Sequence, residues 1–211
     1  MIWQQLLNGL TLGSTYALIA LGYTMVYGII QLINFAHGEI YMIGAFVGLF
    51  LVVNTGLNIG VALLGAMAFC MVLGMLVELI AYRPLRGRAS RLSGIISAIG
   101  VSIFLSTLMV LIAQTNTRRY PDIINIQTFQ VGDLQVSSLQ IIILVVATLL
   151  MVGLQLLVQK TRVGKAMRAC SQDLDAAYLM GINVNRIISF TFAIGSALAA
   201  AGGVMVGIYY N

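Results

Sequence analysis

Side chains that could do chemistry are few in this sequence, and they lie far apart. The chain has one histidine, His37, two cysteines, Cys70 and Cys170, and six acidic residues in 211 positions. They form no paired carboxylates, no set with metal-ligand spacing and no nucleophile beside a base. The sequence also has no Gly-x-x-x-x-Gly-Lys-Ser/Thr phosphate loop. We therefore expect a protein that is not an enzyme, holds no metal or cofactor and does not itself hydrolyse ATP.

One polar segment, at 34–39, separates two hydrophobic runs and carries Asn34, His37 and Glu39. A carboxylate facing lipid costs about 2.5 to 3.5 kcal/mol on insertion scales, so Glu39 must face protein, water or the interface. One interpretation is a tight cytoplasmic turn, in which Asn34 and Gly38 supply the turn chemistry and the other polar groups are solvated. The other is a break in a discontinuous helix, with Asn34, His37 and Glu39 as candidate residues of a translocation pathway.

Glu78 is a second carboxylate associated with an apolar run. It lies about one helical turn before a cluster of arginines that begins with Arg83. The favoured interpretation is an interfacial carboxylate paired with those arginines, and the alternative is a position in the pathway.

The longest basic loop contains a short helical pattern with its own start and stop signals. Ser171 can cap a helix over 172–180, because its hydroxyl can accept a hydrogen bond from a first-turn amide. Asp173 and Asp175 fall in the first turn, where the helix dipole favours them, and Gly181 supplies the C-terminal stop. The sequence therefore predicts a helix of about nine residues in this loop.

A helix this short is not stable alone in water, so something must hold it. Leu174, Ala177, Tyr178 and Gly181 recur at helical spacing and form a narrow apolar face. That face suits either the groove of a partner protein or a position on lipid headgroups or on the chain's own bundle. The spacing alone leaves both interpretations open.

Composition places the chain in lipid. Hydrophobic residues make up 60% of it and charged residues 8%, and its mean hydropathy is +1.01, whereas a soluble domain carries about a quarter charged residues. The basic residues behind the net charge of +5 lie between apolar runs. That pattern is typical of membrane topology and not of a nucleic-acid surface. We expect a membrane protein with no nucleic-acid partner.

Six apolar stretches follow one another, and most reach the roughly 20 residues that a helix needs to cross a bilayer. They are apolar on every side, which excludes the alternating pattern of a membrane β-barrel. The expected fold class is all-α, a polytopic bundle of about six transmembrane helices in a single domain over 1–211. The stretches are 10–33, 39–53, 59–82, 92–113, 139–158 and 187–209.

Glycines four residues apart occur in or beside three of these stretches. In a membrane such pairs let two helix backbones approach closely, because lipid gives no hydrophobic reward for association. Together they predict a tightly packed bundle. The pairs are Gly9/Gly13, Gly44/Gly48 and Gly203/Gly207.

Lysine and arginine orient the bundle, because cytoplasmic loops are enriched in them. The loop 83–91, which includes Arg88, and the loop 160–186 carry most of the basic residues, so both are expected in the cytoplasm. The loop 114–138 balances its arginines with aspartates and is expected outside, as is the N-terminus. This topology separates the two cysteines by bilayer depth, so we expect no disulfide.

The run 175–181, Asp-Ala-Ala-Tyr-Leu-Met-Gly, resembles the Glu-Ala-Ala-x-x-x-Gly motif of ABC importer permeases. In those permeases the motif forms the cytoplasmic coupling helix, which docks on the nucleotide-binding subunit. The resemblance carries the coupling role onto Asp175, Ala176, Ala177 and Gly181, with Asp in place of Glu. The Leu-Pro pair that ends the motif in many permeases is absent.

Four further segments resemble branched-chain amino acid permeases of the LivH type, in family order and over essentially the whole chain. They are NGLTLGSTYAL at 8–18, INFAHGEIYMIG at 33–44, YRPLR at 82–86 and TRVGKAMRA at 161–169. Members of that family continue through further spans. The resemblance therefore implies a permease domain that is C-terminally incomplete in this chain, with its short coupling helix within 160–186.

The resemblance implies a permease subunit of an ABC importer in the bacterial plasma (inner) membrane. A second, homologous permease subunit would complete the pathway for branched-chain or related amino acids. An extracytoplasmic solute-binding protein would deliver the solute, and separate cytoplasmic ATPase subunits would hydrolyse ATP. The competing expectation is a self-contained channel or ion-coupled carrier for a small polar solute. A proton-coupled carrier usually has carboxylates or histidines deep in several spans, and this sequence offers few.

Overall fold

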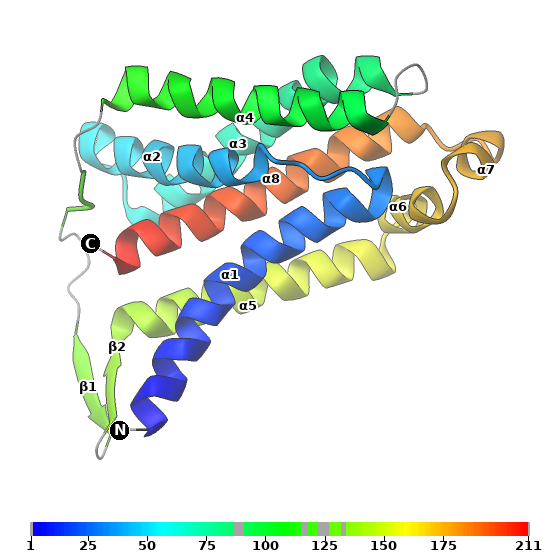
Figure 1. The fold of residues 1–211 in the computed structure, drawn as a ribbon. Coiled ribbons are helices and arrows are strands. Elements are labelled where there is room, and N and C mark those ends of the chain that lie inside the picture. The colour runs from blue at the N-terminus through cyan, green and yellow to red at the C-terminus, as the bar shows by residue number, and fades with distance from the viewer. Residues whose placement is uncertain (1, 87–90, 115–117, 122–126, 132–133, 211) are drawn as a thin grey trace.

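The computed structural model describes residues 2–86, 91–114, 118–121, 127–131 and 134–210. Within these ranges six helices are long and apolar enough to cross a membrane, which confirms the expected all-α polytopic bundle (Figure 1). They are α1 (Ile2–Ile30), α2 (His37–Thr55), α3 (Ile59–Val77), α4 (Arg91–Ala113), α5 (Ser138–Lys160) and α8 (Val184–Tyr209).

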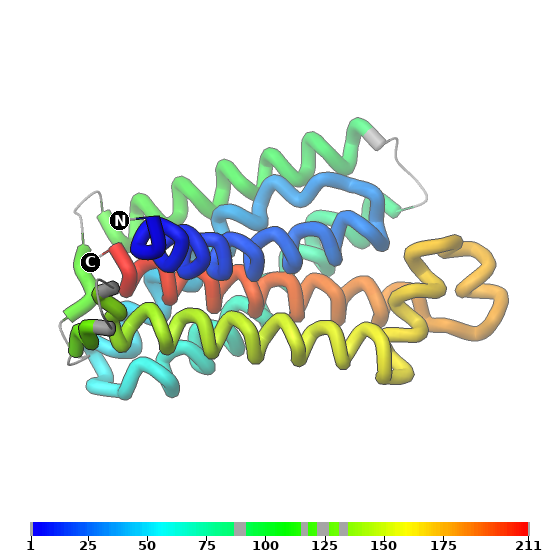
Figure 2. The backbone as a smooth tube through the Cα atoms, turned by 90° about the horizontal axis from the view of Figure 1, so that it is seen from below, coloured from blue at the N-terminus to red at the C-terminus, as the bar shows by residue number. Residues whose placement is uncertain are grey.

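The two short helices α6 (Arg162–Gln172) and α7 (Leu174–Leu179) lie beyond one end of the bundle, as Figures 1 and 2 show. At this end α3 also finishes and α4 begins, whereas both chain termini lie at the opposite end. The two arginine-rich regions are thus on the same side, as the charge pattern predicts. Arg88 itself lies outside the described residues.

A β-hairpin that no sequence pattern predicts lies at the end opposite α7. Its strands β1 (Thr128–Val131) and β2 (Leu134–Ser137) are antiparallel, with Thr128 opposite Ser137. The hairpin is tied to α1, because Gln4 donates to the Gln135 carbonyl at 2.9 Å and accepts from its amide at 3.0 Å. These bonds involve a part of α1 that precedes the predicted start of the span, at residue 10.

Helix α8 is the centre of the bundle, and α1, α2 and α3 all pack against it. Most of its membrane-crossing length is buried, whereas α4 buries the smallest share of any span. A run over 195–203 in which every residue except Leu198 is small allows this burial, because it lets neighbouring backbones come close.

Glycine contacts show how close these approaches are. A Cβ atom added at Gly44 would lie 2.4 Å from the Ala200 Cα, and one at Gly203 would lie 2.3 Å from the Tyr41 carbonyl oxygen. Neither position can accept a larger side chain without a shift of backbone. Gly44 and Gly203 therefore hold α2 directly against α8, as their spacing predicts.

The first glycine pair makes no such contact in the described part of the chain. Cβ atoms added at Gly9 and Gly13 would meet nothing within 4 Å, because both glycines are exposed on α1. Instead, α1 meets α8 where Gly22 and Gly195 face each other, and a Cβ on either would come within 3 Å of the other's carbonyl oxygen.

The end of α3 departs from regular α-helix. It continues as a π-helical turn, η1 (Glu78–Tyr82), and then as a 3₁₀ turn, η2 (Arg83–Leu85). Pro84 lacks an amide hydrogen and disfavours an α-helical residue before it, so the helix ends here. Single π-helical turns occur frequently at functional sites.

Candidate functional site

The segment that connects α1 to α2 runs back into the bundle. It begins at Gln31, which has a positive φ of 54°, and ends where α2 starts at His37. The His37 Nε2 atom lies 3.2 Å from the Ile19 carbonyl oxygen, 11 residues before the end of α1. At 1.5 Å per residue, α2 therefore starts about 16 Å inside the end of α1. It begins at mid-depth in the bundle, as Figure 1 also shows.

The polar residues of this segment contact protein groups. Asn34 and His37 are each only 3% exposed. The Tyr82 hydroxyl donates to Asn34 Oδ1 at 3.0 Å, and the Ser102 hydroxyl donates to Glu39 Oε1 at 3.0 Å. The interpretation of 34–39 as a turn with solvated side chains is therefore wrong. Packing against α1 and α3 removes Asn34 and His37 from solvent, whereas Glu39 is partly buried and contacts α4 through Ser102. Their place in a translocation pathway stays a prediction.

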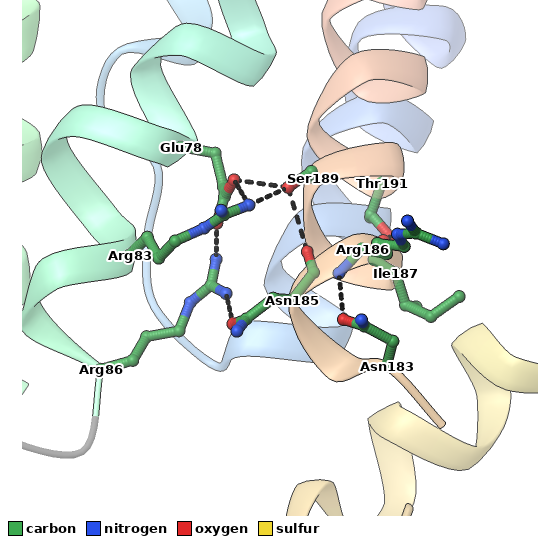
Figure 3. A network of polar contacts seen from close by, with 9 residues as sticks. All are labelled: Glu78, Arg83, Arg86, Asn183, Asn185, Arg186, Ile187, Ser189 and Thr191. Carbon is green, nitrogen blue, oxygen red and sulfur yellow. Dashed lines mark hydrogen bonds and ion pairs between the residues drawn. The ribbon is translucent and has the colours of Figure 1, made fainter. Parts of the chain in front are cut away.

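Glu78 is fully buried and forms ion pairs with Arg83 and Arg86, which confirms the expected pairing with the arginines (Figure 3). The Arg83–Glu78 pair measures 3.1 Å. The Ser189 hydroxyl of α8 donates to Glu78 at 2.6 Å, and Arg86 donates to Asn185 Oδ1, also of α8, at 3.2 Å. The network thus fastens the end of α3 to the start of α8.

Arg86 of this network lies outside the membrane-spanning segments, and the pKa of its guanidinium is shifted. Burial lowers the pKa of the Arg86 guanidinium, and the neighbouring Glu78 carboxylate opposes that shift. An ionised carboxylate inside protein requires such partners, because an unpaired buried charge costs several kcal/mol.

The predicted loop helix exists, but Ser171 does not cap it. Ser171 lies in the last turn of α6, and its hydroxyl donates to the Arg168 carbonyl at 2.8 Å. Asp173 caps α7 instead, because its extended backbone lets one carboxylate oxygen accept from the amides of both Asp175 and Ala176 at 2.9 Å. A carboxylate at this position also complements the positive end of the helix.

Gly181 ends α7 as predicted. Its φ of +82° lies in the left-handed region, which side chains disfavour. The Gly181 amide donates to the Tyr178 carbonyl, and the Ile182 amide donates to the Ala177 carbonyl, each at 3.0 Å. The chain then turns directly into α8.

The apolar side chains of α7 divide between two faces. Ala177 is buried in the chain's own core and Leu174 packs against that core, so these two residues rest on the chain's own bundle, one of the positions that the spacing left open, whereas Tyr178 does not share their contacts. Leu174 and Ala177, which are three positions apart, pack α7 against α6 and α8. By contrast, Tyr178, Leu179 and Met180 are 72%, 83% and 82% exposed.

The motif residues Asp175, Ala176 and Gly181 are exposed on the same tip, beside a hollow of about 570 Å³. The hollow is lined by Tyr178, Leu179, Gly181, Ile182, Asn183, Val184 and Asn185. An exposed apolar tip next to a hollow is a surface that a partner can cover.

Among the described residues, no group of three His, Cys, Asp or Glu side chains could hold a metal ion. Cys70 and Cys170 are both buried, and both are free thiols. The fold thus defines a multi-pass membrane protein whose polar features lie at α2, at η1 and at the α7 tip.

Comparison with known proteins gives the family. Residues 5–211 match the family model described as branched-chain amino acid transport system / permease component. The high-affinity branched-chain amino acid transport system permease protein BraD of Pseudomonas aeruginosa is 47% identical, over 99% of this chain and 71% of the relative. LivH of Escherichia coli K12, which carries the same description, is 44% identical over the same shares.

A more distant relative is the probable branched-chain amino acid transport permease protein LivH of Methanocaldococcus jannaschii, 28% identical over 88% of this chain and 60% of the relative. No solved structure matches the chain. The chain belongs to the family of permease components of branched-chain amino acid transport systems.

Proposed function

We propose that this chain is a permease subunit of an ABC importer in the bacterial inner membrane, and that it is not an enzyme. With a second, homologous permease subunit it forms the pathway for branched-chain amino acids. A solute-binding protein outside the membrane delivers them, and separate ATPase subunits bind at the α7 tip and hydrolyse the ATP. The family match over 5–211 carries this proposal.

The α7 tip supports the ATPase contact. Three consecutive apolar side chains, Tyr178, Leu179 and Met180, are exposed at the end of the bundle that the charge pattern places in the cytoplasm. Contiguous exposed apolar side chains of this kind are typical of an interaction surface. Asp175, Ala176 and Gly181 extend this surface, while buried Ala177 acts from beneath by seating the helix.

The route from α7 into the membrane is short. Gly181 turns the chain directly into α8, and Asn185 and Ser189 in the first turns of α8 bind the Glu78 network. A displacement of α7 by an ATPase would therefore reach α3 and α8 together.

A charge at the tip tests the proposal. Leu179→Arg changes a largely exposed side chain, so the chain should insert and fold normally, whereas desolvating an unpaired charge against a partner is costly. We expect loss of ATPase co-purification, of stimulated ATP hydrolysis and of leucine uptake. Val163→Arg, an equal change at a partly exposed position of α6, is the matched control. Normal ATPase binding and uptake by Leu179→Arg would contradict the proposed docking surface.

Reconstitution separates the proposal from the alternative function. The purified chain alone in vesicles should take up no leucine, whereas the assembly with its partner permease, ATPases and binding protein should do so only with ATP. Uptake by the chain alone under an ion gradient would instead identify a self-contained carrier.

A further inference from the structure

Four basic side chains gather where α5 meets α6, and the proposed function does not use them. This cationic cluster consists of Lys160, Arg162, Lys165 and Arg168, all of which are exposed. In the described part of the chain the ion pairs join Glu78 to two other arginines, so no carboxylate lies within ion-pair distance of the cluster. The cluster therefore presents positive charge that the chain itself does not neutralise.

The cluster lies at the depth of the lipid headgroups. The 23 residues of α5 extend about 34 Å, slightly more than the roughly 30 Å of hydrocarbon in a bilayer, so its last residue, Lys160, reaches the headgroup layer. The sharp turn into α6 keeps the other cations near this level. A Cβ atom added at Gly164 would lie 2.2 Å from the carbonyl oxygens of Leu157 and Val158. Arg168 reaches back to donate to the Val158 carbonyl.

Helix α6 runs across the end of the bundle and not along it, as Figure 2 shows. One side of the helix is buried, through Gly164, Met167 and Cys170, and the latter two belong to the core. Arg162 and Lys165 are three positions apart and lie on the exposed side. A short amphipathic helix that crosses the end of a span and carries its basic residues outward is typical of a membrane surface.

The cluster is continuous with a surface that has the composition of a lipid contact. Helix α5 is the most apolar of the six spans. Its exposed side chains toward the cluster are large and aliphatic, namely Val145, Leu149, Val152 and Leu156. Lys160 follows Leu156 by four residues and so shares its face. A phospholipid can contact this face and the cluster together, whereas a cytoplasmic protein can reach only the cluster. These observations favour lipid as the occupant.

We propose that the cationic cluster binds the phosphate group of an anionic phospholipid, a site that goes beyond the proposed function. The guanidinium of Arg162 and the ammonium groups of Lys160 and Lys165 contact the headgroup, and the acyl chains lie along Leu149 and Leu156. Clusters of four or more basic residues directly beyond a span attract anionic lipid in this way. A zwitterionic lipid such as phosphatidylcholine carries its own cation and gains less, so the site selects phosphatidylglycerol over it.

Site-directed fluorescence quenching tests the proposal on the purified full chain in phosphatidylcholine nanodiscs. The background carries Cys70→Ala and Cys170→Ala, and Val163→Cys, beside the cluster, carries the fluorophore. Phosphatidylglycerol with a nitroxide on its acyl chain should quench this fluorophore more strongly than nitroxide-labelled phosphatidylcholine at the same mole fraction. Added salt should reduce the difference, because the contacts are electrostatic and close to water.

Two double variants separate the cluster from net charge. Lys160→Gln/Lys165→Gln should lower the affinity for phosphatidylglycerol relative to phosphatidylcholine at least about fivefold, the contribution of one basic residue near an anionic surface. Arg118→Gln/Arg119→Gln removes the same charge from two exposed positions at the opposite end of the bundle. It should leave the relative affinity at Val163→Cys unchanged. An equal loss in both variants would overturn the proposal.

The remaining outcomes identify another occupant. Equal quenching by the two lipids in the otherwise unchanged chain would overturn the proposal. If inorganic phosphate at constant ionic strength abolishes the preference for phosphatidylglycerol, the cluster binds free phosphate and not lipid. If binding of the ATPase subunits abolishes it, the cluster is a protein surface. The measurement on the chain alone does not depend on transport, so failure of this site and failure of the proposed function are distinguishable.

Discussion

The Tyr82 hydroxyl donates a 3.0 Å hydrogen bond to Asn34 Oδ1, and so joins the π-helical end of α3 to the segment that leads into α2. Both side chains are buried, and the Tyr82 ring also lies against Phe192 of α8, with 5.2 Å between ring centroids. Three elements that are distant in sequence therefore meet at one tyrosine.

Tyr82→Phe should destabilise the protein without disturbing its packing. The ring remains against Phe192, but buried Asn34 Oδ1 loses its donor, which costs about 1–3 kcal/mol. Thermal unfolding of the purified protein in detergent should show a lower midpoint. Tyr210→Phe, at an exposed position, should leave the midpoint unchanged, and an equal effect of the two changes would contradict the prediction.

Glu78→Gln should be among the most damaging single changes at the α7 end of the bundle. It leaves the largely buried Arg86 without its carboxylate, and breaking a buried pair in this way costs about 3–5 kcal/mol. Combining it with Arg86→Gln removes one uncompensated charge, so the double variant should lose less stability than the sum of the single changes. The unfolding midpoints of the wild type, Glu78→Gln, Arg86→Gln and the double variant measure this coupling. Strictly additive losses of stability would show that the two residues are not energetically coupled.

Gly203→Ala should destabilise the contact between α2 and α8. The added Cβ would lie 2.3 Å from the Tyr41 carbonyl oxygen, a backbone atom that cannot move aside alone, and overpacking of this kind costs about 1–3 kcal/mol. Gly100→Ala makes the same change in α4, where nothing lies within 4 Å, and serves as the control. The two variants should differ clearly in thermal midpoint, and equal midpoints would contradict the packing described.

Gly181→Ala should loosen α7 because alanine disfavours the φ of +82° by about 1–2 kcal/mol. Hydrogen exchange at the Ile182 amide, which bonds the Ala177 carbonyl across the turn, should accelerate. Gly181→Asn should have a smaller effect, since asparagine tolerates the left-handed region. If the Ile182 amide exchanges as slowly in Gly181→Ala as in the wild type, alanine does not strain the turn and the prediction is wrong.

The six spans could be predicted because each is an apolar run of bilayer length, and length and hydropathy are local properties of sequence. The hairpin could not be predicted in this way. Its strands are four residues long and are anchored through Gln4, more than 120 positions earlier in the chain.

The polar features show the same division. The arginine partners of Glu78 could be predicted because they follow within eight residues, whereas Ser189 and Asn185 lie more than 100 positions away and carry no local signal. The α7 cap was misplaced by two residues, because Ser171 and Asp173 both suit the position and only the actual end of α6 distinguishes them. The burial of His37 depends on a connection that folds back along α1, which no periodicity reports.

The central helix has a mechanical consequence. At Gly22/Gly195, Gly44/Ala200 and Gly203/Tyr41, α8 meets its neighbours with almost no intervening layer of side chains that could deform under load. Its 26 residues extend about 39 Å, from the turn at Gly181 to the opposite side of the bundle. A displacement of α7 would therefore be transmitted along the length of α8. Because α1 and α2 pack directly on α8, they would tilt with it.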